Sequence, residues 1–269
     1  MLIVFSAIIL LIVLYILSTM CRSGHPGLKE LHGWAYAHRG LFGNGVPENS
    51  MEAFRLAKEA GYGIELDVHL LADGALAVIH DSPLARTTGE AGRIEDLTAE
   101  ELKNYKLEGT AQTIPLFQEV LDLYQGCAPL IVELKTVGGN HRQLCNAVCR
   151  MLDDYAGAYC IESFDPRCIA WLRKNRSDLI RGQLTENYFV NSKAQIPWIL
   201  RFIMRHQMAN FLLRPDFVAY RFSDRKTVSN FLARKLWGAK GVTWTIKTPE
   251  DYRCAVEEGW LPIFEGFKP

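Results

Sequence analysis

Short apolar runs of β-type composition alternate with helical stretches along most of the chain, and this order constrains the fold more than any other feature. Such alternation predicts a parallel sheet whose strands are joined by crossover helices. The predicted strands are Trp34–Ala37, Gly63–Val68, Leu130–Glu133, Ala158–Ile161, Leu179–Leu184, Phe217–Tyr220, Gly241–Ile246 and Leu261–Phe264. The predicted helices are Ser50–Ala60, Phe117–Tyr124, His141–Tyr155, Pro166–Asn175, Arg225–Trp237 and Pro249–Gly259. This order fits a TIM, or (β/α)8, barrel.

The second strand is followed by a hairpin signal, because Asp73-Gly74 favours a two-residue turn. Leu76–Ile79 is therefore predicted to return antiparallel to that strand instead of adding a ninth strand to the barrel. With a two-residue loop, Asp67 lies opposite His80, and Glu65 shares the face of Asp67 because side chains alternate along a strand. Two carboxylates and an imidazole suit a hard divalent cation beside an acid–base group. An ordinary surface hairpin is the alternative.

An uncharged apolar run from Leu2 to Met20 opens the chain and is long enough to span a bilayer. No Lys or Arg precedes the run, so a cleaved secretory signal fits poorly. Arg22 and Lys29 follow it, and the positive-inside rule then favours an outside N-terminus and a cytoplasmic catalytic domain. The expected organisation is a transmembrane anchor at 1–21, a linker at 22–33 and a barrel domain at 34–269, in a single-pass protein of the cell membrane.

The balance of charged residues limits the class of partner. The chain has 30 Lys+Arg and 30 Asp+Glu, so it lacks the basic field typical of nucleic-acid binding, and no nucleic acid is expected as a partner. Its 7 cysteines form no CxxC pair, and no Cys or His cluster has zinc-binding spacing. Reduced, mostly buried thiols are expected, which favours a domain facing the cytosol.

Ionisable residues gather where the predicted strands end, which is where TIM barrels place their chemistry. They are His38 and Arg39 after the first strand, Glu65 and Asp67 in the second, Glu133 and Lys135 at the third, and Glu162 and Asp165 after the fourth. Charged residues in an otherwise buried strand are costly unless they are paired or bind metal. The pattern therefore predicts a polar site at the mouth of the barrel.

Short motifs occur in order along these strand ends. They are HRG at 38–40, PEN at 47–49, ELD at 65–67, HD at 80–81, ELK at 133–135, SFDP at 163–166 and WT at 244–245. In this order and spacing they resemble the glycerophosphodiester phosphodiesterase family, over residues 34 to 265. The resemblance implies a TIM barrel that hydrolyses glycerophosphodiesters to an alcohol and sn-glycerol 3-phosphate with a divalent metal ion.

The resemblance also implies roles for the matching residues. Glu65, Asp67 and Glu133 match the metal ligands of the family, and three carboxylates suit one Mg²⁺ or Ca²⁺ ion better than zinc. His38 and His80 match its acid–base pair, since one imidazole can deprotonate the nucleophile while the other protonates the leaving alkoxide. The nucleophile is either water or the neighbouring glycerol hydroxyl, and the second route passes through a cyclic phosphate.

Four further residues match positions around the substrate in the same family. Arg39 and Lys135 are expected to neutralise charge on the phosphate oxygens in the transition state. Glu48 is expected to orient Arg39 or a glycerol hydroxyl, and a part in capping the next helix is the alternative. Trp244 is expected to form an apolar wall against the glycerol carbons, with plain barrel packing as the alternative.

Two segments depart from the family pattern. Pro262–Phe267 stands where the last strand of the family ends in a Thr-Asp type of signature, which is expected to affect substrate fit and not catalysis. Gln195–Arg214 is apolar but includes Arg201 and Arg205, so it predicts either an interfacial helix on the bilayer or an outer barrel helix. Membrane contact is expected through residues 2–20 and, in the interfacial case, through 195–214.

Three functions are compatible with these motifs. The leading interpretation is a membrane-anchored phosphodiesterase that acts on a soluble glycerophosphodiester or, as a lysophospholipase D, on a lysophospholipid. Phospholipases of the phosphatidylinositol or sphingomyelinase D type share the barrel and the paired histidines, but the ELK and HD motifs fit the phosphodiesterase family better. A catalytically inactive phosphate-binding membrane protein would tolerate loss of a histidine or carboxylate, yet the whole set is present.

Overall fold

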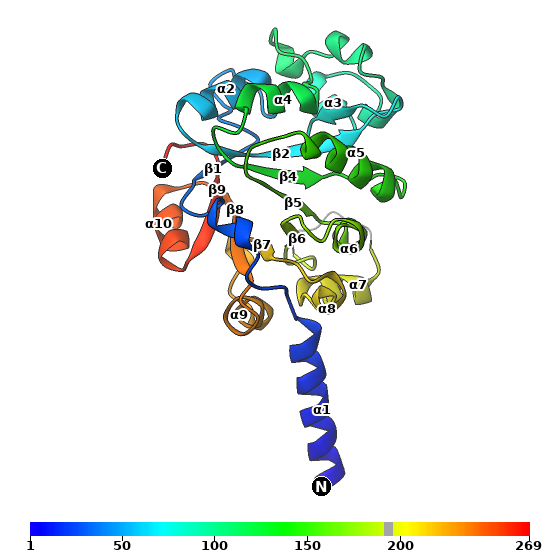
Figure 1. The fold of residues 1–269 in the computed structure, drawn as a ribbon, viewed down its shortest axis with the longest axis vertical. Coiled ribbons are helices and arrows are strands. Elements are labelled where there is room, and N and C mark those ends of the chain that lie inside the picture. The colour runs from blue at the N-terminus through cyan, green and yellow to red at the C-terminus, as the bar shows by residue number, and fades with distance from the viewer. Residues whose placement is uncertain (191–195) are drawn as a thin grey trace.

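The structure is a computed structural model that describes residues 1–190 and 196–269. Eight parallel strands close into a barrel, because β1 pairs with both β2 and β9. The barrel strands are β1 (Tyr36–His38), β2 (Gly63–Leu70), β4 (Leu130–Leu134), β5 (Tyr159–Ser163), β6 (Arg181–Thr185), β7 (Phe217–Arg221), β8 (Lys240–Ile246) and β9 (Trp260–Phe264). Figure 1 shows this ring with helices outside it. The predicted TIM barrel is confirmed.

Helices cover the outside of the barrel and begin where the sequence supplies capping side chains. They are α2 (Met51–Glu59), α4 (Phe117–Tyr124), α5 (His141–Asp153), α6 (Pro166–Asn175), α8 (Asn210–Leu213), α9 (Val228–Phe231) and α10 (Pro249–Glu257). Ser50, Asp165 and Thr248 accept hydrogen bonds from backbone N–H groups in the first turns of α2, α6 and α10. Apolar residues at helical spacing face the strands, as Leu144 and Leu152 of α5 do.

Most predicted elements agree with the structure to about two residues at their ends, the usual uncertainty of such boundaries. The helix predicted over Arg225–Trp237 is the exception. Thr227 is extended and accepts a hydrogen bond from the Asn230 N–H, so α9 begins only after it. The chain then continues in a π-helical turn over Leu232–Leu236.

The hairpin after β2 forms as predicted, but its register differs by one residue. β3 (Leu76–Val78) runs antiparallel to β2. The Ile79 N–H donates to the Asp67 carbonyl, so Ile79 and not His80 lies opposite Asp67. The predicted pairing of Asp67 with His80 is therefore wrong, and His80 lies beyond the end of β3.

The shift in register comes from the length of the loop. The Leu71 N–H donates to the Ala75 carbonyl, which closes a loop of three residues where two were predicted. The Asp73 carboxylate accepts a hydrogen bond from the Ala75 N–H, and Gly74 adopts a left-handed φ of +87°. A three-residue loop with glycine at its left-handed position is a common hairpin connection, and it competes with the two-residue turn at the same Asp-Gly pair.

Residues 81–116, for which the sequence predicts no strand or helix, form an insertion between β3 and α4, seen at the top of Figure 1. It contains α3 (Ala85–Thr88) and three short 3-10 turns, Ile94–Asp96, Glu101–Asn104 and Leu107–Gly109. Its buried side chains, such as Leu84 and Leu102, pack against Ala77 and Ile79 of the hairpin. The hairpin is thus held between the barrel and the insertion, which fixes the position of the following His80.

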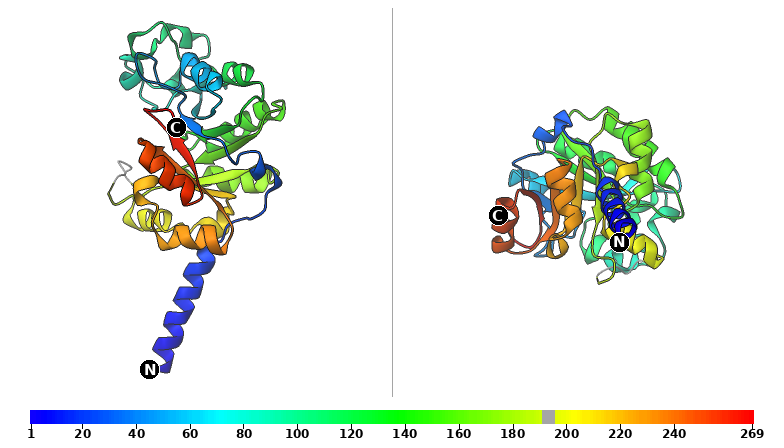
Figure 2. Two further views of the ribbon diagram at one scale, coloured as in Figure 1. Left: turned by 90° about the vertical axis from the view of Figure 1, so that its left-hand side faces the viewer. Right: turned by 90° about the horizontal axis from the view of Figure 1, so that it is seen from below.

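The N-terminal helix α1 (Leu2–Ser18) projects away from the barrel in Figures 1 and 2, and its apolar side chains are largely exposed. It ends at Ser18, where the Ser18 and Thr19 hydroxyls donate to carbonyls of the last turn. Across residues 1–190 and 196–269, no helix combines the length and the apolar character needed to cross a membrane. The transmembrane helix predicted within 1–21 is thus not found.

The apolar segment predicted over 195–214 contains two short helices in its described part, 196–214; residue 195 lies outside the described residues. α7 (Trp198–Arg205) exposes Trp198 and Phe202, while α8 follows directly and packs near α6. The His206 ring between them lies 6.4 Å from the Tyr15 ring of α1, measured between centroids. This segment therefore lies at the base of α1, and its contact with a bilayer stays a prediction.

Candidate active site

Three carboxylates from two adjacent strands meet inside the mouth of the barrel. Glu65 and Asp67 lie on β2 and Glu133 lies on β4, where Asp67 and Glu133 are direct neighbours in the parallel ladder. One carboxylate oxygen of each residue lies within 4.8 Å of the other two, and all three residues are buried. The structure thus brings together the metal ligands predicted from the sequence.

The three carboxylates differ in their electrostatic environment. Burial raises the pKa of Glu65 well above its usual range, and the charges of Asp67 and Glu133 raise it further. Burial also raises the pKa of Glu133. Burial acts in the same direction on Asp67, but nearby cations, Lys135 foremost, outweigh it and hold the pKa of Asp67 well below its usual range.

Lys135 supplies part of the positive charge that this cluster requires. Its Nζ lies 2.9 Å from Asp67 Oδ1 and 2.7 Å from Glu133 Oε1. Although burial opposes its charge, the carboxylates prevail and raise the pKa of Lys135. One ammonium group does not neutralise three carboxylates, so the cluster favours a further cation.

The donor set fits a hard divalent cation. Three carboxylates on rigid strands, completed by water and phosphate oxygens, match the preference of Mg²⁺ or Ca²⁺ for oxygen ligands. In the part of the chain that the structure describes, no cysteine or histidine joins the group, which does not suit zinc. A cation among the three oxygens would relieve the repulsion that raises the pKa of Glu65.

Arg39 is positioned by the turn that follows β1. Gly40 has a φ of +80°, and a Cβ there would lie 2.7 Å from the Ala53 backbone, so this place in the HRG motif requires glycine. Arg39 itself adopts a left-handed φ of +54°. Its Nη1 donates to Glu48 Oε1 at 2.9 Å, and its Nε lies 3.4 Å from Asp67 Oδ2.

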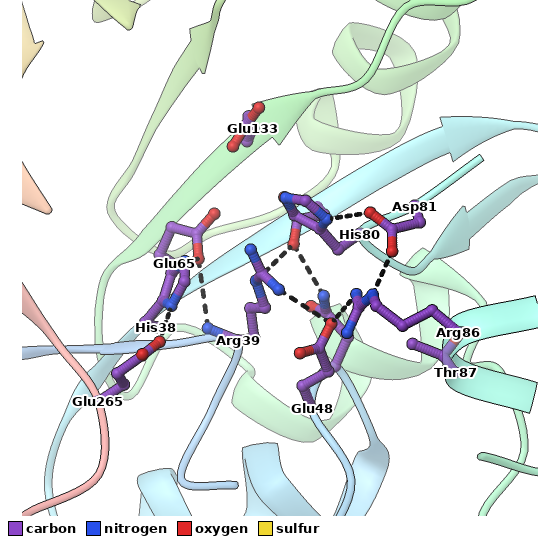
Figure 3. A network of polar contacts seen from close by, with 12 residues as sticks. His38, Arg39, Glu48, Glu65, His80, Asp81, Arg86, Thr87, Glu133 and Glu265 are labelled. Carbon is purple, nitrogen blue, oxygen red and sulfur yellow. Dashed lines mark hydrogen bonds and ion pairs between the residues drawn. The ribbon is translucent and has the colours of Figure 1, made fainter. Parts of the chain in front are cut away.

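Glu48 connects two arginines at the edge of the site (Figure 3). Its Oε1 accepts hydrogen bonds from Arg39 at 2.9 Å and from Arg86 of the insertion at 2.6 Å. Burial acts to raise the pKa of Glu48, but the two arginines outweigh it and lower that pKa. The Ser50 hydroxyl caps α2, so the alternative in which Glu48 takes part in capping is not needed. The Glu48 side chain instead holds Arg39 in place.

His38 has a different partner on each ring nitrogen. Nδ1 lies 2.6 Å from Glu265 Oε2, and Nε2 lies 3.9 Å from Glu65 Oε2. Burial lowers the pKa of His38, and the hydrogen bond to Glu265 works against that shift. Although burial opposes its charge, His38 and Lys247 lower the pKa of Glu265 to about 2. With Nδ1–H donated to Glu265, Nε2 remains for chemistry beside the carboxylate cluster.

His80 is held in a comparable way after the end of β3. Its Nδ1 lies 2.6 Å from Asp81 Oδ1, the neighbouring residue of the HD motif. His80 first, and then Arg86, hold the pKa of Asp81 well below its usual range. His69 of β2 lies behind His80: its Nε2 is 3.3 Å from the His80 carbonyl oxygen and its Nδ1 is 2.7 Å from Glu95 Oε1. His69 therefore fixes the backbone that carries His80.

Four residues of this network were not predicted as site residues: Asn49, Asp81, Arg86 and Glu265. Asn49 donates from Nδ2 to Asp67 Oδ2 at 2.8 Å. Asn49 and Asp81 stand inside the PEN and HD motifs, so their adjacency to predicted residues was an available signal. Arg86 belongs to the insertion, and no local pattern marks it. Glu265 lies in the segment expected to affect substrate fit, and its contact with His38 places it beside a predicted catalytic residue as well.

The aromatic side of the same cavity is formed by Phe164, which directly follows β5, and by Trp244 on β8. The rings of Phe164 and Trp244 meet edge to face with their centroids 5.5 Å apart. The cavity is lined by these two rings and by His38, Arg39, Glu65, His80, Glu133, Glu162, Leu184 and Ile263. The wall predicted at Trp244 therefore stands at the cavity that holds both histidines.

Replacing Glu265 by glutamine should move the limb of the pH profile that belongs to His38 toward lower pH. Burial lowers the pKa of His38 and the Glu265 carboxylate opposes this, so loss of its charge lets that pKa fall further. The pH dependence of kcat/KM measures the shift. Glu250→Gln, at an exposed ion pair with Arg253, is the matched control. Superimposable profiles for Glu265→Gln and wild type would show that this carboxylate does not act on His38.

Known proteins resemble this chain in sequence. A family model described as the glycerophosphoryl diester phosphodiesterase family matches residues 38–264. A glycerophosphodiester phosphodiesterase from Bacillus altitudinis is 45% identical over 114 residues, which cover 40% of this chain and 46% of that protein. Glycerophosphodiester phosphodiesterase 1 from Mus musculus is 28% identical over 251 residues, which cover 80% of this chain and 72% of that protein. The chain thus matches less than half the length of the Bacillus protein.

Solved structures extend the likeness to the fold. A phosphodiesterase from Oleispira antarctica in complex with the product sn-glycerol-3-phosphate has a TM-score of 0.74 at 23% identity, and the match covers 91% of this chain and 95% of that one. A glycerophosphodiester phosphodiesterase from Thermotoga maritima has a TM-score of 0.66 at 25% identity, covering 87% and 94%. Because the family model spans the barrel and all of the site motifs, the chain belongs to the glycerophosphoryl diester phosphodiesterase family.

Proposed function

We propose that the protein hydrolyses glycerophosphodiesters to an alcohol and sn-glycerol 3-phosphate. The observation that carries this proposal is the meeting of two histidines, each with a carboxylate on its Nδ1, beside one cluster of three buried carboxylates. Hydrolysis of a phosphodiester needs a proton acceptor, a proton donor and positive charge around the phosphate. The Bacillus and mouse relatives are named for this activity, which supports it.

The side chains divide the work as follows. Arg39 and Lys135 bind the phosphate oxygens and stabilise the charge that develops on them. One histidine accepts the proton of the nucleophile, a water or the neighbouring glycerol hydroxyl, and the other donates a proton to the leaving alkoxide. Glu265 and Asp81 each engage the Nδ1 of one ring, so both rings act through Nε2. Glu48 keeps Arg39 from turning away from the site.

Glu65, Asp67 and Glu133 would hold one divalent cation, Mg²⁺ or Ca²⁺. When bound, such an ion supplies Lewis-acid stabilisation to the phosphate oxygens. Asn49 keeps one oxygen of Asp67 engaged by a hydrogen bond and so orients that carboxylate toward the cluster.

Release of sn-glycerol 3-phosphate from glycerophosphocholine tests the proposal. We expect the purified protein to release it with Mg²⁺ or Ca²⁺, to lose the activity in EDTA, and to regain it when the ion is restored. A protein that binds sn-glycerol 3-phosphate in calorimetry but turns over no glycerophosphodiester with either ion would instead be the inactive phosphate-binding alternative.

We also propose that α1 attaches the protein to the cell membrane, with the catalytic domain on the cytoplasmic side. α1 is apolar on all sides and buries none of its residues. Trp198 and Phe202 of α7, and Phe211 and Leu212 of α8, are exposed. Both helices lie near the base of α1 in Figure 1. Large apolar side chains exposed on neighbouring elements are typical of a surface that contacts lipid or another protein. This arrangement would bring lysophospholipids within reach as substrates.

Flotation with liposomes tests the attachment. We expect the full-length protein to float with the lipid and a variant lacking residues 1–18 to lose most of this binding. Trp198→Ser with Phe202→Ser should reduce any binding that remains. Removal of α1 should lower turnover of a lysophospholipid in vesicles and leave turnover of soluble glycerophosphocholine unchanged. A full-length protein that stays in the lipid-free fraction would contradict the attachment.

A further inference from the structure

The cavity at the barrel mouth contains a polar pair that the mechanism above does not use. Glu162 on β5 is 1% exposed, and no described residue gives its Oε2 a hydrogen bond. The Nε1 of Trp244 on β8 is also buried and also lacks a partner among the residues that the structure describes. Both residues line the cavity that contains the histidines. Buried polar atoms without partners are costly, so the cavity favours a ligand that satisfies both.

The chemistry of the two atoms narrows the class of ligand. Trp244 Nε1–H only donates a hydrogen bond, whereas a carboxylate oxygen of Glu162 accepts one. A hydroxyl group accepts the first bond and donates the second. An ammonium group only donates and cannot satisfy the indole N–H, and an ionised phosphate oxygen only accepts, so it satisfies Glu162 only in the protonated form that burial favours by raising the pKa of this carboxyl. A hydroxyl group satisfies both atoms whether Glu162 is ionised or protonated. The pair therefore recognises an alcohol.

The location of the pair indicates which alcohol. Glu162 lies beside Glu133 in the ladder of β4 and β5, on the side away from β2, while Arg39 follows β1. A phosphate held between Arg39 and Lys135 leaves the rest of the substrate to extend toward β5 and the aromatic edge at β8. The terminal hydroxyl of a glycerol phosphate is its farthest group from phosphorus, so it is the hydroxyl that can extend furthest toward this end of the cavity.

We propose that Glu162 and Trp244 bind the terminal hydroxyl of the glycerol moiety and so select glycerol over shorter diols. The inference rests on the proposed phosphodiesterase function and names a determinant of its specificity. The carboxylate of Glu162 is separate from the cation cluster of Glu65, Asp67 and Glu133, so it is available to a neutral group. Phe164 packs against Trp244 and keeps the indole at the cavity.

Two substrates isolate the contribution of this hydroxyl. Glycerophosphocholine carries it, whereas the phosphocholine ester of ethane-1,2-diol keeps the hydroxyl next to the phosphate and lacks the terminal hydroxymethyl group. We expect Glu162→Met, which keeps the size of the side chain but removes the acceptor, to lower kcat/KM for glycerophosphocholine by roughly 10- to 100-fold. The kcat/KM for the ethanediol ester should change by less than about threefold. Glu162→Gln keeps an acceptor oxygen and should lose less than Glu162→Met.

Equal losses on the two substrates would overturn the proposal, because Glu162 would then serve the cation or the fold. Calorimetric titration with Mg²⁺ or Ca²⁺ is the second readout, and we expect Glu162→Met to bind the ion as the wild type does. If Glu162→Met does not fold, Trp244→Phe removes the N–H donor and keeps an aromatic ring, although a smaller one, at the wall. We expect Trp244→Phe to lower kcat/KM by about 3- to 10-fold for glycerophosphocholine alone. An equal change in kcat/KM on both substrates would contradict the proposal.

The proposal stays testable if the wild-type protein hydrolyses neither ester. In that event the phosphodiesterase function fails, and calorimetry compares binding of sn-glycerol 3-phosphate with that of ethanediol phosphate. A preference for the glycerol compound in the wild type that disappears in Glu162→Met supports the hydroxyl site on its own. Equal affinities in the wild type would refute it.

Discussion

Replacing either His38 or His80 by alanine lowers the turnover of glycerophosphocholine by about 10²–10⁴-fold, the usual contribution of general acid–base catalysis. Each ring has its Nδ1 engaged by a carboxylate, at 2.6 Å in both cases, and acts on the substrate through Nε2. Alanine removes the proton carrier but leaves Arg39 and Lys135 to bind the phosphate. The loss should therefore appear in kcat, with little change in KM, in steady-state kinetics.

A good leaving group separates the two histidines by role. A nitrophenolate departs without being protonated, so the variant that lacks the general acid should recover most of its activity on a glycerophospho-nitrophenyl ester. The variant that lacks the general base should not recover. His141→Ala is the matched control, because this ring contacts the Gly139 carbonyl outside the site. Near-normal turnover of glycerophosphocholine in both His38→Ala and His80→Ala would remove them from the mechanism.

The barrel could be predicted because each of its strands and helices is marked by a pattern within its own short stretch of sequence. Parallel strands buried on both faces read as short apolar runs, and the helices between them show a different period. β4 is buried at every position, and its sequence Leu130–Leu134 is apolar apart from Glu133. A single charge inside such a run is itself a signal, since burial without a partner or a metal is costly. The same reasoning identified Glu65 and Asp67 on β2.

The position of His80 could not be derived from pairing alone. The loop at Asp73-Gly74 has two compatible turn geometries, and the difference of one residue changes which residue lies opposite Asp67. His80 reaches the site because the insertion packs on the hairpin and because His69 holds the His80 carbonyl. The position of His80 therefore depends on contacts between segments, and these cannot be predicted from a two-residue sequence pattern.

Glu265 and Arg86 show the same limit for charged residues. Glu265 is 227 positions from His38, and Arg86 is 38 positions from Glu48. Only the closing of the barrel at β1 and β9 brings Glu265 to the first histidine, and only the folded insertion brings Arg86 over the site. A motif can therefore identify the groups that carry the chemistry and some of their partners, such as Asp81, whereas Glu265 and Arg86 come from distant parts of the chain.

Replacing Glu65 by glutamine should abolish the response of the enzyme to Mg²⁺ or Ca²⁺ while leaving the ion-free protein at least as stable as the wild type. Burial and the adjacent Asp67 and Glu133 raise the pKa of Glu65, so the folded state binds a proton more tightly than the unfolded chain does. Stability of the ion-free protein is then lost as pH rises from the unfolded pKa of this carboxyl through its raised value in the fold. A neutral glutamine removes that loss, and it replaces one of the three carboxylate ligands by an uncharged amide oxygen, which holds a divalent cation less tightly.

Thermal unfolding in EDTA and in excess Mg²⁺ separates these opposite effects. The wild type should gain stability with the ion because only the folded state binds it, whereas the Tm of Glu65→Gln should be the same in both buffers. The affinity of the variant for the ion should fall by more than roughly 100-fold, since even residues that merely orient a ligand are worth 10- to 100-fold. Glu250→Gln again serves as the exposed control. A Glu65→Gln protein that melts below the wild type in EDTA would show that Glu65 stabilises the fold without the ion, through contacts such as the 3.2 Å hydrogen bond that its carboxylate accepts from the Arg39 N–H. The three carboxylates would then not be a cluster that needs a cation to offset its repulsion.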